Sequence, residues 1–308
     1  MLSYVLPAFV RGILHFIWVA VFSVLCASSA IVCGLLKYFF PVKPWMLLMT
    51  RLMSALIIFW GDCMRFGVVL FTQTSVEVRG MEGLSKEKNY LIIANHQSWA
   101  DVLLIYQRFN HKISAIKVFM KSQLLWLPVI GWGCWLMGFP FLKRYTKEQL
   151  VKNPSLKGKD IKSTKKMCRR AAQIPVTIMS FVEGTRYRDY KAKRQKTPYQ
   201  HLLKPRAGGV AYIMTAMEDM LDQVLDVTLI YPAGKSGFWY YLCGTLPKVI
   251  IQVHPRPITK AMIGDYAEDR DFRTHFQAWL NQLWLEKDNE IDQAIKAYAE
   301  VGKHDQDH

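Results

Sequence analysis

The sequence predicts an α/β fold with a mixed, partly parallel sheet flanked by helices, preceded by membrane-anchoring helices at the N-terminus. Residues 1–71 are mostly apolar, and most of the charged residues lie beyond them. After Thr72, short apolar runs alternate with helical stretches, which is typical of α/β architecture. The 308 residues are enough to bury a sizeable core. We therefore expect an anchor over residues 1–71 and a second domain over residues 72–308.

The first apolar stretch has the composition of a membrane-spanning helix. From Gly12 to Leu36 no residue carries a formal charge, and only His15 could acquire one. A spanning helix needs about 20 such residues. A cleaved signal peptide has a shorter apolar core of about 7–15 residues after a positive region, and only Arg11 precedes this one. We expect one transmembrane helix at about residues 12–36.

The second apolar stretch, at about residues 45–71, is interrupted by Arg51, Asp62 and Arg65. Charges near the bilayer centre cost about 2.5–3.5 kcal/mol each. This membrane-associated helix therefore either spans with its charges near the ends or lies at the membrane surface. A core helix of the following domain is the third possibility.

The remaining elements follow from short apolar runs and helical periodicity. Expected strands are Ser75–Val78, Tyr90–Ala94, Ile113–Val118, Phe139–Leu142, Val176–Phe181, Val224–Tyr231 and Val249–Val253. Expected helices are Asp101–Arg108, Lys121–Trp126, Ile161–Gln173, Ala207–Leu221 and Asp271–Ala299. The last of these carries an amphipathic stripe, which favours a packing face.

The charge balance indicates anionic partners. The formal net charge is +16, and two basic stretches, Lys157–Arg170 and Arg186–Arg206, flank the candidate sites described below. No zinc-finger, RNP or helix-turn-helix pattern occurs, so nucleic acid is not an expected partner. Basic stretches beside an apolar anchor favour an anionic membrane surface. The six cysteines form no C-x-x-C pair and indicate reduced thiols rather than a disulfide or metal framework.

His96 and Asp101 are the strongest candidates for chemistry. They lie in the segment NHQSWAD (residues 95–101), directly after the expected strand Tyr90–Ala94. A neutral imidazole is the usual base near pH 7, and a carboxylate can fix its tautomer and stabilise the imidazolium. A turn between the strand and a helix beginning near Ser98 would bring the two side chains together. The helix N-terminus would also offer free N–H groups to the reacting centre.

A structural interpretation competes with the chemical one. Ser98 and Asp101 have the spacing of a helix capping box, with an acid three residues after the N-cap. A lone histidine after a strand is also often a structural residue. No Gly-x-Ser-x-Gly elbow surrounds Ser98, so a serine hydrolase is not favoured.

A second candidate site follows the expected strand Val176–Phe181. It is the segment Glu183-Gly184-Thr185-Arg186. Glycine lets the backbone turn close to a ligand, threonine adds a hydroxyl donor, and arginine presents a planar fork suited to phosphate. Glu183 would orient the arginine or hold the loop, or it would form an ordinary ion pair in a turn.

Two further basic residues could bind an anion. Arg144 ends the segment GFPFLKR (residues 138–144), after the expected strand Phe139–Leu142. Arg206 precedes the small-residue start of an expected helix, and helix N-termini bind anions. The apolar run Val227–Tyr231, followed by Pro232, is expected to be architectural.

The order of these segments resembles that of the glycerolipid acyltransferases of the 1-acylglycerol-3-phosphate (lysophosphatidic acid) type. The resemblance covers roughly residues 90–232 and depends on the first segment, Asn-His-x-Ser-x-x-Asp, together with Glu-Gly-Thr-Arg. Residues 138–144 fit a Gly-x-x-Phe-x-x-Arg pattern, and the basic helix start is a looser match. Val182 replaces the usual proline, and the spacer at residues 187–203 is long and basic. Both departures are closer to the longer, lysocardiolipin-acyltransferase-like branch.

The resemblance implies a role for each candidate residue. His96, with Asp101 behind it, would deprotonate the free hydroxyl of lysophosphatidic acid. The alkoxide would attack the thioester of acyl-CoA or acyl carrier protein and give phosphatidic acid, without a metal or another cofactor. The residues that would hold or shape the site of the acceptor phosphate are Arg144, Arg186, Arg206, Glu183, Gly184 and Thr185.

The same resemblance implies that residues 72–308 are an acyltransferase domain with a C-terminal amphipathic helix. The location would be a bacterial inner membrane, with the active site facing the cytoplasm. Two alternatives stay open: a remodelling enzyme acting on another lysophospholipid, and a non-catalytic membrane protein that binds anionic lipid or a partner protein. The acyl donor, the chain-length preference and the oligomeric state also stay open.

Overall fold

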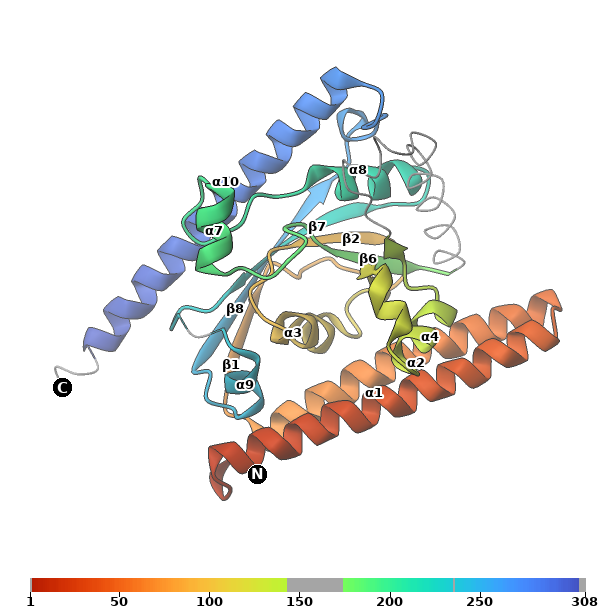
Figure 1. Ribbon diagram of the computed structural model, residues 1–308, viewed down its shortest axis with the longest axis horizontal. Helices are drawn as coiled ribbons and strands as arrows, with labels where there is room; N and C mark the ends of the chain where they lie inside the picture. The colour runs from red at the N-terminus through yellow and green to blue at the C-terminus, as the bar shows by residue number, and fades with distance from the viewer. Residues whose placement is uncertain (1, 143–173, 235, 305–308) are drawn as a thin grey trace.

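The computed structural model describes residues 2–142, 174–234 and 236–304. A six-stranded mixed sheet forms the centre, helices cover both of its faces, and a long N-terminal hairpin of helices lies along one side (Figure 1). This arrangement confirms the predicted α/β class with two apolar helices at the N-terminus.

The α-helices of the described chain differ widely in length. They are α1 (Ala8–Phe39), α2 (Lys43–Phe71), α3 (Ala100–Phe109), α4 (Ile130–Leu136), α7 (Asp189–Gln195), α8 (Ala207–Ala216), α9 (Phe238–Leu242) and α10 (Arg270–His304). Short 3-10 helices occur at η1 (Leu2–Tyr4), η2 (Ser122–Trp126) and η4 (Lys260–Met262).

The main sheet brings three strand ends to one edge. Its strands are β1 (Ser75–Arg79), β2 (Tyr90–Ala94), β3 (Ala115–Val118), β6 (Val176–Phe181), β7 (Gln223–Ile230) and β8 (Lys248–Pro257). Their order is β1-β8-β7-β2-β6-β3, and neighbours are parallel except β7 and β8. Ala94 of β2 pairs with Phe181 of β6 and Val227 of β7. The segments that follow these three parallel strands therefore meet at the same edge, where α/β proteins bind ligands.

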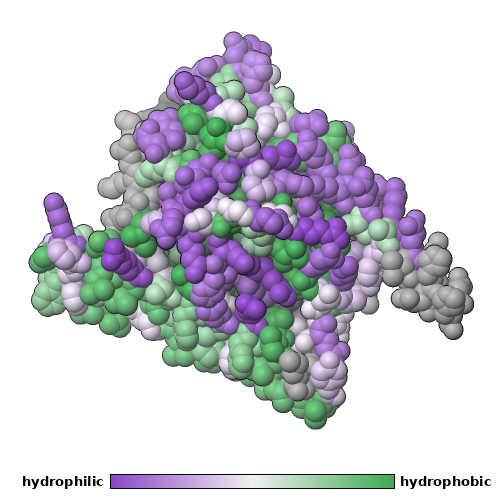
Figure 2. Space-filling model, turned by 180° about the vertical axis from the view of Figure 1, so that it is seen from behind, coloured by the Kyte–Doolittle hydropathy of each residue, from purple (hydrophilic) through white to green (hydrophobic). Residues whose placement is uncertain are grey.

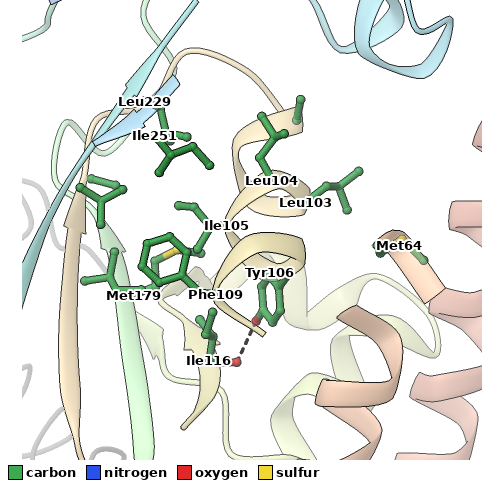
Figure 3. Packing of buried hydrophobic residues seen from close by; sticks show 14 of the residues in the cluster. Met64, Leu103, Leu104, Ile105, Tyr106, Phe109, Ile116, Met179, Leu229 and Ile251 are labelled. Carbon is green, nitrogen blue, oxygen red and sulfur yellow. Dashed lines mark hydrogen bonds between the residues drawn. The ribbon is translucent and has the colours of Figure 1, made fainter. Parts of the chain in front are cut away.

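Two hydrophobic cores sandwich the sheet. Within β2, Ile92 and Ala94 face the core on the side of α3, whereas Leu91 and Ile93 face the core on the side of α8 and α10. Figure 3 shows that side chains of α3 fill the space between the sheet and α2. β2 is fully buried because helices cover both faces of the sheet, which explains its continuous apolar sequence.

The N-terminal hairpin packs closely against the α/β domain. A Cβ atom on Gly12 of α1 would lie 2.6 Å from Sγ of Cys243, which directly follows α9. Near the other end of α1, a Cβ atom on Gly34 would lie 2.8 Å from the side chain of Leu136 in α4. Both helices of the hairpin are long and apolar enough to cross a membrane. The contacts show that α1 lies alongside the domain at both of its ends.

α2 is also joined to the domain, through a charged residue within its apolar sequence. Asp62 accepts hydrogen bonds from Asn110 Nδ2 at 2.8 Å and contacts His111 Nε2 at 2.9 Å. The carboxylate is therefore directed toward the residues that follow α3, which accounts for one charge in the second apolar stretch.

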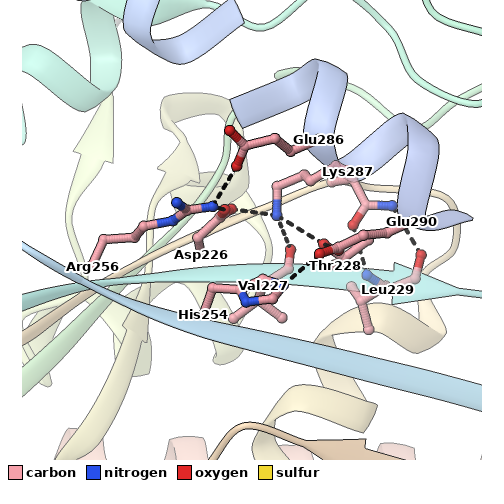
Figure 4. A network of polar contacts seen from close by, with 10 residues as sticks. Asp226, Val227, Thr228, Leu229, His254, Arg256, Glu286, Lys287 and Glu290 are labelled. Carbon is pink, nitrogen blue, oxygen red and sulfur yellow. Dashed lines mark hydrogen bonds and ion pairs between the residues drawn. The ribbon is translucent and has the colours of Figure 1, made fainter. Parts of the chain in front are cut away.

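α10 packs on the sheet through an apolar stripe and a polar network. Phe276, Leu280, Leu283 and Trp284 are buried against the core on the side of α8, as the predicted amphipathic stripe requires. Beside them, Lys287 reaches the middle of β7 (Figure 4). The helix is therefore held to the sheet by apolar packing and by charges.

Several elements differ from the prediction in extent or kind. Residues 141–142 form β5, which pairs with β4 (Met120–Lys121) in a separate two-stranded sheet rather than joining the main one. The expected helix at residues 121–126 is the 3-10 helix η2, and the helix from Ala207 ends at Ala216 rather than Leu221. The expected helix Ile161–Gln173 and the basic stretch Lys157–Arg170 lie outside the described residues.

Candidate active site

The candidate site forms after the ends of β2, β6 and β7. Asn95 joins two of these strands, because its Nδ2 donates to the Leu229 carbonyl at 3.0 Å and its Oδ1 accepts from the Leu229 N–H at 2.8 Å. The Tyr187 N–H donates to the carbonyl of His96 at 2.7 Å, which ties the loop after β6 to the turn after β2. The backbone around His96 is therefore fixed from both sides.

His96 and Asp101 meet as their spacing predicts. Nδ1 of His96 lies 2.8 Å from Oδ2 of Asp101. Asp101 is completely buried, whereas the His96 side chain keeps 14% of its surface exposed. The imidazole stacks on the ring of Phe181, with 4.0 Å between ring centroids. The turn thus provides an oriented histidine with an accessible edge, backed by a buried carboxylate.

Asp101 also organises the start of α3. Its Oδ2 accepts hydrogen bonds from the N–H groups of Gln97 at 2.7 Å and Ser98 at 2.9 Å, while the Ala100 N–H donates to Ser98 Oγ at 3.2 Å. One carboxylate therefore both caps the start of α3 and contacts His96. The N–H groups of Gln97, Ser98 and Ala100 are already bonded and are therefore not free for the reacting centre.

Tyr231 is a site residue that the sequence interpretation missed. Its hydroxyl donates a hydrogen bond to Oδ1 of Asp101. Burial, followed by the Asp101 charge, raises the pKa of Tyr231 well above its usual value, so the phenol stays protonated. The sequence placed Tyr231 at the end of an expected strand, which was the available signal. The local sequence does not predict that this strand, β7, pairs with β2 and so brings Tyr231 to Asp101.

Glu183 lies in a different environment from the one expected. It is completely buried, and neither carboxyl oxygen has a hydrogen-bond partner among the described residues. Burial raises the pKa of Glu183 well above its usual value. The nearby backbone N–H groups of His96 and Leu203 lower this pKa by less, and neither has the geometry of a full hydrogen bond to the carboxyl group. Its oxygens form no ion pair with Arg186, so the expectation that it orients the arginine is wrong.

The other residues of this segment have partners of their own. Gly184 has a φ angle of 70°, a conformation that favours glycine and turns the chain after β6. Thr185 Oγ1 accepts a hydrogen bond from Lys191 Nζ of α7 at 2.7 Å. The Arg186 guanidinium lies 4.7 Å from the ring centroid of Trp99, a cation–π contact that orients it.

A cavity of about 1080 Å³ connects this site to the hairpin. Its lining includes five of the predicted site residues, namely His96, Gly184, Thr185, Arg186 and Arg206. Other parts of the wall come from α1, α2, α4 and the residue after α4, with Ala27, Ile57, Trp60, Cys134 and Met137 among them. One space is thus bordered by a histidine and two arginines in one part and by apolar side chains in another.

The structure does not bring all predicted residues to the cavity. Asp101 and Glu183 are buried behind its wall, and Arg144 lies outside the described residues. Trp99, Phe181 and Tyr212 line the cavity although no motif singled them out. The arrangement can abstract a proton at His96, bind an anion at the two arginines and hold an apolar chain.

Comparison with known proteins gives a consistent result. The family model described as acyltransferase matches residues 75–235. The 1-acyl-sn-glycerol-3-phosphate acyltransferase epsilon of Mus musculus is 27% identical, over 73% of this chain and 64% of that protein. Lysocardiolipin acyltransferase 1 of Danio rerio is 24% identical, over 68% of this chain and 53% of that protein. The chain therefore spans less than two thirds of the length of these relatives.

A solved structure shares the fold. It is the 1-acyl-sn-glycerophosphate acyltransferase of Thermotoga maritima, with a TM-score of 0.50 and 16% sequence identity. The match covers 89% of this chain and 95% of that one. It therefore includes segments beyond the part of the sequence that the family model matches.

Proposed function

The chain belongs to the acyltransferase family, and we propose that it transfers a fatty acyl group from acyl-CoA or acyl carrier protein to lysophosphatidic acid, giving phosphatidic acid. The observation that carries this proposal is the His96–Asp101 pair at the wall of a cavity that combines two arginines with an apolar surface. An acceptor with a hydroxyl, a phosphate and a fatty chain fits these three features.

The chemistry follows from the tautomer of His96. Its Nδ1–H donates to Asp101, which leaves the lone pair of Nε2 free to accept a proton. Nε2 takes the proton of the acceptor hydroxyl while that oxygen attacks the thioester carbonyl carbon. The tetrahedral intermediate collapses by breaking the carbon–sulfur bond, and the thiolate takes the proton back from the imidazolium. Asp101 stabilises the imidazolium between these two steps.

Arg186 and Arg206 are the proposed ligands of the acceptor phosphate, because both line the cavity with His96. A guanidinium can donate two parallel hydrogen bonds to a phosphate. Stacking on Trp99 restricts Arg186, so little freedom would be lost on binding. Gly184 and Thr185 would shape the wall beside the phosphate, and Arg144 stays a predicted third ligand.

We further propose that the hairpin holds the enzyme on a membrane. The hairpin exposes large apolar side chains, among them Phe16, Leu25, Val32 and Leu35 of α1 and Leu48, Phe59 and Phe66 of α2. Figure 2 shows hydrophobic residues gathered along the lower edge of the molecule, below a mainly hydrophilic surface.

The proposed orientation differs from the expected transmembrane helix at about residues 12–36. Because α1 contacts the domain at both ends, crossing the bilayer would carry α4 and α9 into the hydrocarbon as well. A hairpin lying in the interface, with its free side toward the acyl chains, avoids this cost. The cysteine pattern favours a site that faces the cytoplasm. The bacterial inner membrane stays a prediction.

A second candidate is acyl transfer to another lysophospholipid. The named activity of the zebrafish relative and the long basic spacer at residues 187–203 favour it. Two arginines recognise a phosphate but not the group attached to it, so the first and second candidates share the same mechanism.

A panel of acceptors tests both candidates. Purified protein in detergent would be given radiolabelled acyl-CoA with lysophosphatidic acid, lysophosphatidylglycerol, lysophosphatidylinositol or lysocardiolipin, and the lipid products would be separated. We expect phosphatidic acid as the main product. Product from only another acceptor would establish the second candidate. No product from any acceptor, with acyl carrier protein tried as donor too, would contradict both.

A further inference from the structure

Tyr231 reaches the catalytic candidates from a different strand. It lies one residue beyond β7, it is 4% exposed, and its ring belongs to the core between the sheet and α3. Its hydroxyl donates to Oδ1 of Asp101, the carboxyl oxygen that does not contact His96. Tyr231 therefore reaches His96 through Asp101, and its hydroxyl also interacts with the side chain of Ser98.

The carboxylate of Asp101 divides its two oxygens between different tasks. Oδ2 receives the His96 Nδ1–H and the N–H groups of Gln97 and Ser98. Oδ1 receives the Tyr231 hydroxyl. A hydrogen bond to one oxygen draws negative charge away from the other, so it weakens the attraction between Oδ2 and the imidazole. It also fixes the rotation of the carboxylate about its own axis.

The position of Tyr231 is itself held firmly. Asn95 bonds to both backbone groups of Leu229, two residues before it. Further back on β7, Lys287 of α10 donates to the Val227 carbonyl at 2.7 Å (Figure 4). Because β7 is tied to β2 on one side and to α10 on another, the phenol has little freedom to leave Asp101.

We propose that Tyr231 is a positioning residue that fixes the orientation of Asp101 and limits how strongly Asp101 holds the protonated form of His96. The expected effect on the rate of acyl transfer rests on the proposed function. The expected effect on the hydrogen bond between His96 and Asp101 does not. In acyl transfer the imidazolium must return its proton to the leaving thiolate. A carboxylate that attracts the imidazolium too strongly would slow this return.

Other charged groups face the pair and must stay constant in the test. Glu183 is buried beside the site and interacts electrostatically with Asp101, as does Arg186. Arg188 donates to the Gln97 carbonyl at 3.4 Å, and Lys121 and Arg206 line the cavity. None of these is altered when only the Tyr231 hydroxyl is removed.

Tyr231→Phe is the test, because it removes the hydroxyl and keeps the ring. We expect kcat to fall about tenfold with little change in KM for either substrate, since Tyr231 contacts Asp101 rather than the cavity. We also expect the acid limb of the kcat/KM profile to move to higher pH by about one unit, because the imidazolium is held more tightly. In protein labelled with ¹⁵N-histidine, the Nδ1–H proton resonance of His96 should move downfield.

Two matched variants separate positioning from general stability. Tyr90→Phe removes another completely buried hydroxyl, at the far end of β2, where it accepts the Ser85 N–H at 2.9 Å. This control should leave the kinetics and the His96 resonance unchanged. Replacing Tyr231 with 3-fluorotyrosine keeps the shape of the side chain and makes its hydroxyl a stronger donor. The acid limb of kcat/KM should then move to lower pH, and the His96 Nδ1–H resonance should move upfield. That replacement also keeps the proposal testable if Tyr231→Phe does not fold.

The outcomes distinguish this inference from the proposed function. An active wild type, with kcat, acid limb and resonance all unchanged in Tyr231→Phe, would overturn the inference and leave acyl transfer standing. An inactive wild type would contradict the proposed function, and the His96 resonance alone would then decide the inference. Equal changes in Tyr90→Phe would show that the effect is a general loss of packing and would also overturn it.

Discussion

Asp101 has a structural task and a proposed chemical task in the same turn. Its carboxylate caps the start of α3 through the N–H groups of Gln97 and Ser98, and it also orients His96. A substitution such as Asp101→Ala would therefore disturb both the helix start and the histidine. This double use explains why the spacing of these residues fits both a capping box and a catalytic pair.

Glu183 makes the stability of the protein depend on pH. Its pKa is raised by burial, so in the folded state it stays protonated at pH values where the unfolded chain has lost this proton. Below its ordinary value of 4.5 both states are protonated, and Glu183 makes no pH-dependent contribution to stability. As the pH rises from there to the folded pKa, this group lowers the free energy of unfolding by about 1.4 kcal/mol per pH unit.

Glu183→Gln removes this dependence, because an amide does not titrate. We expect the melting temperature of the variant to rise relative to wild type as the pH increases above about 5, because the folded-state pKa of Glu183 is raised. Near pH 4 the difference between the two melting temperatures should be smallest, because Glu183 is then protonated in both the folded and the unfolded state. Differential scanning fluorimetry across this range measures the difference in melting temperature. The other ionisable groups are the same in both proteins, so their contributions cancel. A difference independent of pH would mean that Glu183 is ionised in the folded protein.

Local spacing predicted the residues of the site that lie close together in sequence. His96 and Asp101 meet because one strand–turn–helix unit contains both. Tyr231 could not be predicted in the same way, because its contact requires β7 to pair with β2, far away in the chain. Likewise, the burial of Glu183 depends on the packing of several segments, whereas its sequence suggested only a polar loop.

At the scale of elements, a buried charge cluster joins α10 to the sheet. Lys287 is 1% exposed and forms an ion pair with Asp226 of β7, which is also contacted by Arg256 of β8 (Figure 4). Glu286 contacts the same arginine at 2.7 Å. Such a cluster stabilises a fold only when every charge has a partner. Here it fixes the register of α10 on β7, the strand that directly precedes Tyr231.

The exposed side of α1 is the element on which membrane attachment is proposed to depend. Leu25 and Val32 are one heptad apart, so they lie on the same face, and each is more than half exposed at 54% and 56%. We expect Leu25→Asp with Val32→Asp to release the protein from vesicles containing anionic lipid, because each charge is costly in an apolar environment. Sedimentation with the vesicles measures the bound fraction.

Leu285→Asp is the matched control, since Leu285 is a 47% exposed leucine on α10, away from the hairpin. This variant should sediment with vesicles as the wild type does. Unchanged binding of the double variant would contradict the proposed attachment. Circular dichroism would show whether each variant keeps its fold.

Elements with a mainly apolar sequence were predictable, and short polar or glycine-containing helices were not. β2 (YLIIA) and β6 (VTIMSF) have the predicted bounds because apolar residues dominate both strands. α7 has the sequence DYKAKRQ, without an apolar stripe, and it forms with Asp189 in its first turn and cations in its last, where they favour the helix dipole. α4 contains two glycines that weaken a helix in isolation, and its contact with α1 stabilises it.

At the scale of the whole molecule, the fold brings two kinds of surface to one cavity. The strand ends supply His96 and Arg186, while α1, α2 and α4 supply the apolar wall. A lipid resting at the hairpin could therefore place its chain among apolar side chains and its headgroup beside the base. This arrangement explains why the chain combines an apolar N-terminal segment with a basic α/β domain.

The most direct test is the single-turnover rate of acyl transfer to lysophosphatidic acid by wild type and His96→Ala, with binding of the lysolipid measured on the same samples. His275→Ala, an exposed histidine on α10, is the control. We expect His96→Ala to bind the lysolipid normally and to transfer the acyl group about a thousandfold more slowly, because the base is lost. A rate within a few fold of wild type would contradict the role of His96 and, with it, the proposed mechanism.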